Sequence, residues 1–208
     1  GLFFTVPDIT DVRGEQYRNN KNNLEIHSEL GDLVSIQSIV ADGNNLSEKD
    51  FNITLRKRAQ SWVYQVQSGN RKTQIYNAFT GDLLNSISEK EATWIVRNKT
   101  SMNPVEAELI NEAKTGSEYR GRDLPLYRIK VEEPKSGVVY IDPVTGDIMA
   151  IRTTLWRVWD FLWSLHIMDY RERDDFSHWL IRIFAALSVM TVISGIVLWI
   201  ISSKLAKK

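Results

Sequence analysis

Alternation of apolar and polar positions predicts two β-hairpins in the first three quarters of the chain. Residues 61–66 alternate in this way, a Ser-Gly-Asn turn follows, and residues 73–78 return. Residues 126–131 and 138–141 repeat the arrangement around a Pro-Lys-Ser-Gly turn. Because successive side chains on a strand point to opposite faces, a period of two on each side of a turn indicates antiparallel strands with one buried face.

The two hairpins also share a turn sequence, which indicates a diverged duplication. Tyr64 leads to a Thr-Gly-Asp turn around Gly81, and Tyr127 leads to a Thr-Gly-Asp turn around Gly146. The tyrosines are 127 − 64 = 63 positions apart and the glycines 146 − 81 = 65, so the second copy has two more residues between the matching points. Glycine adopts positive φ at little cost, as a bulged turn requires. We therefore predict equivalent structural turns, without a catalytic role, at the two glycines.

A helix and a further strand are predicted between the hairpins. Ser88 can cap a helix, and Glu91, three residues later, can bond back to the Ser88 amide. Apolar residues then recur on one face, which predicts a helix over residues 89–98. Residues 105–109 alternate apolar side chains with glutamate and favour a strand, although Asn103-Pro104 would also suit the start of a helix.

An uncharged apolar run covers residues 183–203, with Arg182 and Lys204 immediately outside it. As a helix this run would be about 31 Å long, close to the roughly 30 Å hydrocarbon thickness of a bilayer. Lysines follow the run, whereas the preceding loop, residues 169–175, is net acidic. Because Lys and Arg are retained in cytoplasmic loops, we expect a cytoplasmic C-terminus and an extracytoplasmic N-terminal part.

The first 50 residues carry weaker signals. The chain starts with Gly1-Leu2-Phe3-Phe4 rather than with methionine. A cleaved signal peptide or a cut after an earlier membrane helix would leave such an end, and the apolar start favours the lost helix. Val34, Ile36 and Ile39 then suggest a short strand or helix.

Composition narrows the classes of function. Lys plus Arg number 26 and Asp plus Glu number 26, so no basic face predicts a nucleic-acid partner. The chain has no cysteine, which excludes disulfides, thiolate metal sites and cysteine nucleophiles within it. No paired His and carboxylate, HExxH motif or phosphate-binding loop is found. We therefore expect no catalytic residues and no intrinsic enzymatic activity.

Residues 155–170 form an aromatic segment in which Trp156, Trp159 and Trp163 recur at helical spacing. Tryptophan suits bilayer interfaces because its large apolar ring carries one N–H that needs a polar partner. We expect a helix that lies at the membrane surface or docks against another membrane protein, with these three indoles as its interface.

Two sequence motifs stand out in the second copy. They are Leu124-Pro125-Leu126-Tyr127, on the first strand, and Tyr140-Ile141-Asp142-Pro143-Val144-Thr145-Gly146, on the second strand and its turn. Both resemble motifs of the PepSY domain. The first copy is similar but degraded, since Asn77-Ala78-Phe79 stands where Asp-Pro-x is usual. With the terminal apolar helix and its Ser194-Gly195, residues 50–200 resemble the PepSY-associated transmembrane proteins.

This resemblance implies an α+β fold, with a helix on an antiparallel sheet, that serves in binding or inhibition rather than in chemistry. Larger relatives include siderophore and ferric reductases that carry b-type haem on histidines near helix ends. His166 and His178 stand in comparable places, whereas His27 lies in a polar stretch and is expected at the surface. On one straight helix, residues 12 apart differ in direction by about 120°, so these two could not clamp one iron together. Each would need a histidine from a lost helix or another subunit.

The sequence thus predicts an α+β fold with two diverged PepSY-like units, an aromatic interfacial helix and a C-terminal transmembrane helix. The predicted segments are an N-terminal region over 1–50, the two units over 51–87 and 88–153, the interfacial helix over 155–170 and the membrane helix over 179–203. We expect a binding module in the bacterial inner membrane, with its main domain periplasmic, that serves as accessory or assembly subunit of a membrane redox complex. The alternatives are electron transfer through haem b and regulation or inhibition of an extracytoplasmic protease. Expected partners are the lipid bilayer and membrane-protein subunits or a second copy.

Overall fold

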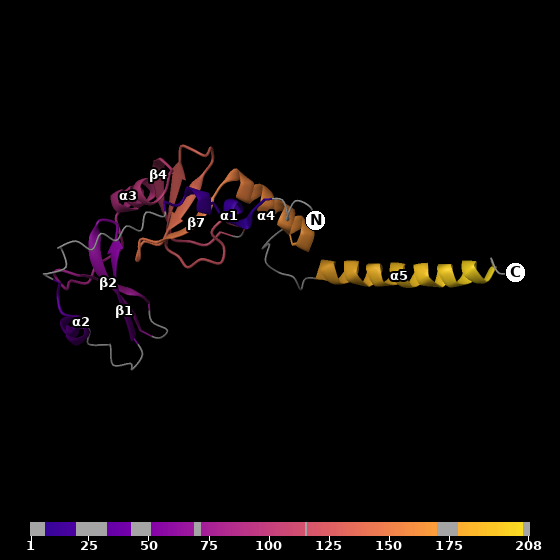
Figure 1. Cartoon of the computed structure of the whole chain (residues 1–208), viewed down its shortest axis with the longest axis horizontal. Helices are drawn as coiled ribbons and strands as arrows, with labels where there is room; N and C mark the ends of the chain where they lie inside the picture. Colours follow the sequence, from indigo (N-terminus) through magenta and orange to yellow (C-terminus); the bar gives the residue numbers. More distant parts are fainter. Residues whose placement is uncertain are drawn as a thin grey trace. The chain divides into compact units, whose positions relative to one another are not determined.

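The computed structural model describes residues 7–19, 33–42, 51–68, 72–114, 116–169 and 179–205. It divides into two compact units, residues 1–157 and 158–208, and each is considered by itself. The elements are labelled in Figure 1, and their bounds follow in chain order. They are α1 (Ile9–Val12), the 3-10 helix η2 (Glu15–Tyr17), α2 (Ile36–Asp42), β1 (Phe51–Arg58), β2 (Ser61–Ser68), β3 (Gln74–Asn77), α3 (Glu89–Lys99), β4 (Pro104–Ile110), β5 (Leu126–Val131), β6 (Val138–Ile141), β7 (Ile148–Arg152), α4 (Thr154–Ile167) and α5 (Trp179–Leu205).

The first predicted hairpin consists of β2 and β3, which form a three-stranded antiparallel sheet with β1 in the order β1-β2-β3. Ile39 of α2 packs on this sheet, so the short helix covers it. The apolar side chains of the alternating pattern are the ones buried there, which confirms the predicted hairpin. Its core consists of Ile39, Trp62, Tyr64, Val66, Tyr76 and Ala78.

The second hairpin lies inside a four-stranded antiparallel sheet in the order β4-β5-β6-β7. The segment at 105–109 is a strand, as its alternation favoured, and pairs with β5. One face of the sheet packs on α3 to form the largest core among the described residues. That core consists of Ala59, Ile87, Ala92, Ile95, Val96, Met102, Ile129, Val131, Val139, Ile141 and Ile151. The observed architecture is therefore α+β with antiparallel sheets, as predicted.

Helix α3 begins where the sequence predicted. The Ser88 hydroxyl accepts a hydrogen bond from the Glu91 amide, and the Glu91 carboxylate accepts one from the Ser88 amide. This capping box satisfies two amides that the first helical turn leaves without partners. The helix then presents Ala92, Ile95 and Val96 to the sheet.

Strand register is the same in the two predicted copies. Tyr64 on β2 faces Tyr76 on β3, and Tyr127 on β5 faces Ile141 on β6. Position 76 bridges Leu83 just as position 141 pairs with Ile148. Before the hairpin loop, equivalent residues of the two copies are 127 − 64 = 63 positions apart, and after it they are 141 − 76 = 65 apart. The second copy therefore has its two additional residues in this loop. In the first copy, β3 is paired on this side only through the bridge to Leu83. In the second copy, the corresponding strand β6 pairs with a whole strand, β7.

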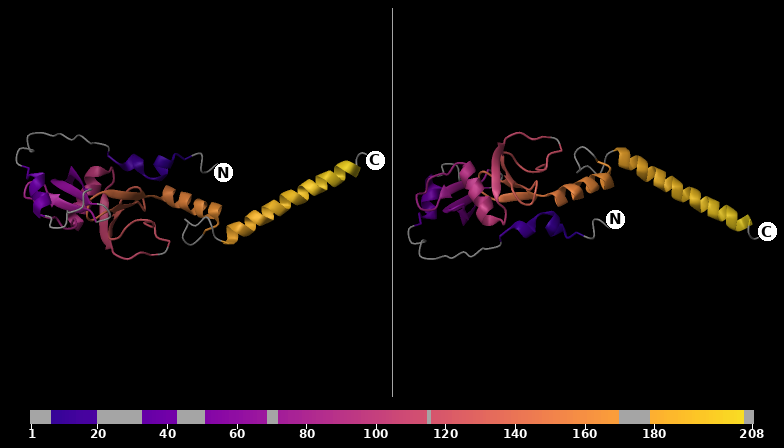
Figure 2. Two further views of the ribbon diagram at one scale, coloured as in Figure 1. Left: turned by 90° about the horizontal axis from the view of Figure 1, so that it is seen from below. Right: turned by 90° about the horizontal axis from the view of Figure 1, so that it is seen from above.

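The N-terminal segment packs against the second sheet rather than the first. Arg18 bridges Thr100 after α3, and its Nη2 donates to the carbonyl of Ile148 at 3.1 Å. Gly14 approaches so closely that a Cβ there would lie 2.8 Å from Cγ2 of Ile151. Figure 2 shows the segment, in indigo, alongside the orange β7. The segment that precedes the first copy in the sequence therefore contacts the second copy in the structure.

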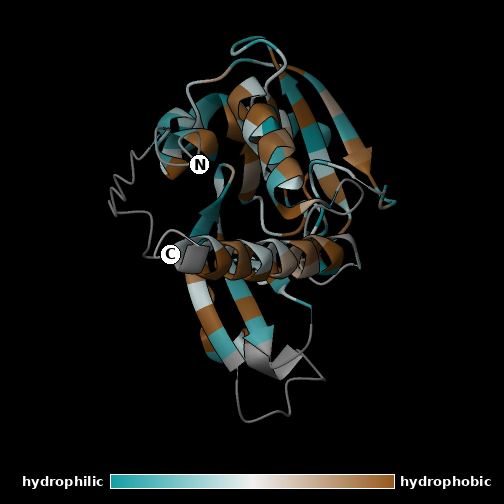
Figure 3. Cartoon of the chain, turned by 90° about the vertical axis from the view of Figure 1, so that its right-hand side faces the viewer, coloured by the Kyte–Doolittle hydropathy of each residue, from teal (hydrophilic) through white to brown (hydrophobic). Residues whose placement is uncertain are grey.

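Helix α5 belongs to the other compact unit. Its residues Ile181–Ser203 are long and apolar enough to cross a membrane, and none of the window is buried against other parts of the structure. Figure 3 shows hydrophobic colouring along most of the helix. The prediction of a C-terminal helix able to span a bilayer is confirmed by length and composition.

Candidate functional site

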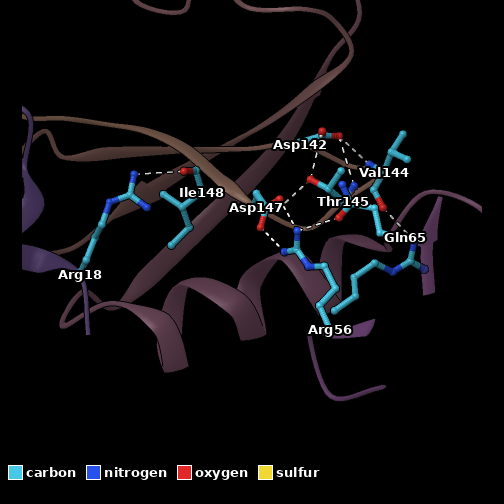
Figure 4. A network of polar contacts seen from close by, with 9 residues as sticks. Arg18, Arg56, Gln65, Asp142, Val144, Thr145, Asp147 and Ile148 are labelled. Carbon is cyan, nitrogen blue, oxygen red and sulfur yellow. Dashed lines mark hydrogen bonds and ion pairs between the residues drawn. The ribbon is translucent and has the colours of Figure 1, made fainter. Parts of the chain in front are cut away.

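The Thr-Gly-Asp turn of the second copy is held by its own side chains. Asp142 Oδ1 accepts from the Val144 amide at 2.7 Å, and its Oδ2 accepts from the Thr145 hydroxyl at 3.1 Å. The Thr145 oxygen in turn accepts from the Asp147 amide at 3.2 Å. Gly146 has φ of 71° and donates to the Asp142 carbonyl. The network is drawn in Figure 4.

The corresponding turn of the first copy has the same construction. Asn77 Oδ1 accepts from the Phe79 amide at 2.8 Å, and the Gly81 amide donates to the Asn77 carbonyl. Gly81 has φ of 81°. The prediction of equivalent turns at the two glycines is confirmed, since both use the left-handed region that glycine enters without strain.

An arginine of the first sheet reaches the turn of the second. Arg56 on β1 donates from Nη1 to Asp147 Oδ2 at 2.8 Å and from Nη2 to the other carboxylate oxygen. The same Nη1 also donates to Oε1 of Gln65 at 2.9 Å. A bidentate pair fixes the orientation of both groups. The ion pair therefore joins the two sheets at a defined position (Figure 4).

Arg58, two residues later on β1, is buried at the same junction with 6% of its surface exposed. Its Nη1 donates to the carbonyls of Asn85 and Val144, both at 2.9 Å. Its Cγ would lie 3.1 Å from a Cβ on Gly146, and Ile95 Cδ1 would lie at 3.2 Å. A side chain at position 146 would therefore press against this arginine and against Ile95.

Burial and ion pairing act in opposite directions on the charges of the junction. Burial alone would raise the pKa of the Asp147 carboxyl, but hydrogen bonds and charge from Arg56 outweigh it and hold that pKa below its ordinary value. The same hydrogen bond raises the pKa of Arg56. Burial lowers the pKa of Lys99, although the negative charge of Asp147 partly offsets the effect. The junction thus favours an ionised Asp147.

We expect Asp147→Asn to remove a pH-dependent contribution to stability of about 1 kcal/mol, because the pair is partly solvated. The carboxyl pKa is lower in the folded state than in the unfolded state, so its contribution to stability is fully present above the unfolded pKa, near 4. That contribution is lost as the pH falls through the folded pKa. Denaturation of the full chain between pH 7 and pH 2 measures this. Wild type and variant should converge in acid, and Arg56→Gln should behave like Asp147→Asn. Parallel pH curves for wild type and Asp147→Asn would contradict the assignment.

The junction binds two parts of the chain together rather than presenting reactive groups. The Asp142 carboxylate and the Thr145 hydroxyl are engaged within the turn, and the Asp147 carboxylate is held by Arg56. Within the described ranges, no group of three or more His, Asp or Glu residues could hold a metal. Sequence reasoning missed Arg56 and Arg58; the available signal was the basic run 56–58 at the end of an otherwise apolar alternation.

A cleft of about 510 Å³ opens beside the turn. Its lining is mixed: six of the ten lining residues are apolar, and the charged ones are Lys72, Asp123 and Asp142. Recognition sites commonly combine an apolar lining with a few polar groups. The lining residues are Lys72, Thr73, Asp123, Leu124, Pro125, Leu126, Asp142, Pro143, Val144 and Met149.

Trp156, one of the predicted interface residues, is buried beneath two arginines. Arg152 lies over its ring at 4.1 Å from the centroid and Arg120 at 5.6 Å. Only 8% of Trp156 is exposed. Burial lowers the pKa of Arg152 to about 10, and the charges of Arg122 and Arg120 add to this shift. Trp156 is thus held through cation–π contacts at the start of α4.

The remaining predicted residues lie further along α4 or outside the described ranges. Trp159 and Trp163 stack with ring centroids 5.4 Å apart, and His166 lies 6.1 Å from Trp163. His166 is exposed near the end of the helix. His178 and His27 lie outside the described residues. The roles predicted for the three tryptophans and the two candidate haem ligands stay predictions.

Comparison with known families identifies part of the chain. Residues 86–152 match the family model of PepSY, described as the peptidase propeptide and YPEB domain. No curated protein and no solved structure was found to match the chain. The matched range contains α3 and all four strands of the second sheet, in the order that the resemblance implied. Residues 86–152 are therefore a PepSY domain, in a chain whose C-terminal apolar helix is consistent with a PepSY-associated transmembrane protein.

Proposed function

We propose that the protein is a membrane-anchored, extracytoplasmic PepSY-type binding module that serves as accessory or assembly subunit of a membrane redox complex. The observation that carries the proposal is the union, in one chain, of a PepSY domain at 86–152 with a helix long enough to span a bilayer. The Arg56–Asp147 pair and Arg58 add a second sheet to that domain at a fixed position. Such a two-sheet body offers a larger recognition surface than one sheet alone.

The cleft beside the Thr-Gly-Asp turn is the part of this surface that we assign to partner recognition. It lies where the segment that precedes β3 meets the second sheet, so both copies of the repeat contribute to it. Lys72 is exposed and can pair with an acidic group of a partner without any change in the fold. A lining that combines apolar side chains with charged ones would suit a loop or peptide segment of another subunit.

Orientation follows from the charges that flank the membrane helix. The basic end supports the proposal of a C-terminus in the cytoplasm of a bacterium and a PepSY domain in the periplasm. A reporter fused after Lys208 should behave as cytoplasmic, and one inserted at the exposed turn of Gly121 should behave as exported. An internal reporter at Gly121 that stays cytoplasmic would overturn the orientation.

Purification of the tagged full chain from its own membranes tests the function. We expect redox subunits of the membrane to co-purify, and Lys72→Glu to reduce their recovery severalfold. Lys90→Glu, which makes the same charge change on the exposed side of α3, is the matched control and should leave recovery unchanged. Recovery of an extracytoplasmic protease alone would instead support the regulator or inhibitor that the family description suggests.

Haem b electron transfer is the second candidate, and it depends on ligands beyond the described residues. A b-type haem needs histidine ligands in a pocket that limits water. The described residues supply one imidazole, that of His166, which is exposed on α4. They therefore do not build a haem site on their own, and a second ligand would have to come from another subunit or from a segment outside the described residues. The absorption spectrum of the same purified preparation tests this: a Soret band that His166→Ala removes would favour haem.

A further inference from the structure

Helix α4 has an unusual distribution of exposed and buried side chains. Asp160 and Ser164, which are polar, are 1% and 2% exposed. Val158, Phe161 and Leu165, which are apolar, are 43%, 53% and 43% exposed. On a helix at a water-facing surface the polar side chains face outward and the apolar ones inward. Between Val158 and Leu165, helix α4 has the opposite arrangement.

The exposed apolar side chains lie on one face. Val158, Phe161 and Leu165 are separated by three and four residues, which places them in a row along the helix. Leu155, one turn before Val158, is also exposed, at 37%. Trp156, whose ring is covered by arginines, lies on the other side. The outward face is therefore aliphatic and phenyl in character and does not include the buried Trp156.

Helix α4 is connected closely to the membrane helix. Residues 168–178 separate its end from the start of α5, a connection that can extend at most about 40 Å. A bilayer that contains α5 therefore lies within reach of this face. At 14 residues α4 is about 21 Å long. This is too short to cross the roughly 30 Å hydrocarbon layer, so a membrane-associated α4 must lie along the surface.

We propose that α4 lies in the plane of the bilayer surface, with Val158, Phe161 and Leu165 in contact with lipid acyl chains. The inference rests on the proposed membrane anchoring and deepens it, because it assigns a second membrane contact whose residues differ from the predicted tryptophans. Arg157 borders this face and is held by Glu118, with Nη2 donating to Oε2 at 3.0 Å. In this arrangement the Arg157 guanidinium lies at the level of the lipid headgroups, where charged side chains of an interfacial helix are found.

Single-cysteine labelling can test the contact, since the chain has no cysteine of its own. A polarity-sensitive fluorophore would be placed at Phe161→Cys or Leu165→Cys in the full chain, one copy per lipid nanodisc. We expect a blue-shifted emission and strong quenching by a nitroxide on the upper acyl chain. The matched control is Val105→Cys, an apolar position on β4 that is 68% exposed and should show neither effect.

Each outcome decides the proposal. Labels at 161 and 165 that behave like the label at 105 show that this face is in water and overturn it. A blue shift without nitroxide quenching shows that protein rather than lipid covers the face and also overturns it. A label at Val192→Cys in α5 tests the anchoring separately. Quenching there, without quenching at 161, would leave the proposed anchoring intact and reject the surface contact.

Discussion

Gly146→Ala should lower the free energy of unfolding by about 2–3 kcal/mol. Gly146 has φ of 71°, and a residue with a Cβ in this left-handed region is strained by about 1–2 kcal/mol. The new methyl group would also meet Arg58 Cγ at 3.1 Å and Ile95 Cδ1 at 3.2 Å. Both neighbours are buried, so relief of the contact disturbs the junction between the sheets. Denaturation of the detergent-solubilised full chain, followed by tryptophan fluorescence, measures the loss.

Gly81→Ala is the matched control because Gly81 occupies the same turn in the first copy. It has φ of 81°, but its nearest neighbour would be Val34 Cγ1 at 3.5 Å, an ordinary contact. Its substitution should therefore show the backbone strain alone, about 1–2 kcal/mol. Equal losses for the two variants would mean that the contacts of Gly146 with Arg58 and Ile95 contribute nothing.

Arg58→Met should cost about 2–3 kcal/mol, although methionine retains much of the apolar volume. The change leaves the carbonyls of Asn85 and Val144 without their donor at a site where Arg58 is only 6% exposed. A fully buried acceptor that loses its partner costs about 1–3 kcal/mol. These hydrogen bonds are part-buried, so each costs less, but the change removes the donor of both acceptors at once. Unfolding measured as for Gly146→Ala gives the loss.

Arg97→Met, on the exposed side of α3, makes the same chemical change outside the junction and should alter stability by less than about 0.5 kcal/mol. Similar small effects for both arginines would show that Arg58 does not hold the two sheets together. Combining Arg58→Met with Asp147→Asn should give less than the sum of the separate losses, because both act on one interface.

Local patterns were sufficient for the separate elements. The alternation at 61–66 and 126–131 predicted both hairpins, because a half-buried strand requires a period of two regardless of what covers it. Ser88 and Glu91 predicted the start of α3, because a capping box acts within one helical turn. The repeated Thr-Gly-Asp located two left-handed glycines, because the Asx-type hydrogen bonds of each turn are made between neighbours in sequence.

Contacts between distant residues could not be predicted in this way. Arg56 and Asp147 are 91 positions apart, and nothing near either residue specifies the other. The sequence alone also left 33–42 undecided, since a helix this short forms only by packing Ile39 on the first sheet.

The sequence by itself determined the two sheet-forming copies, the capped helix between them and the apolar helix at the end. Each of these elements depends on residues that are close together in the sequence. Only the tertiary structure decided how the copies join through Arg56, Arg58 and the turn of Gly146. It also decided which side of α4 is outward: helical spacing identifies a face, but both the tryptophans and the row from Val158 to Leu165 have that spacing. Burial depends on what packs against a helix. Arg152 covers Trp156 from four positions earlier, but Arg120, which also lies over the ring, comes from 36 positions earlier in the chain.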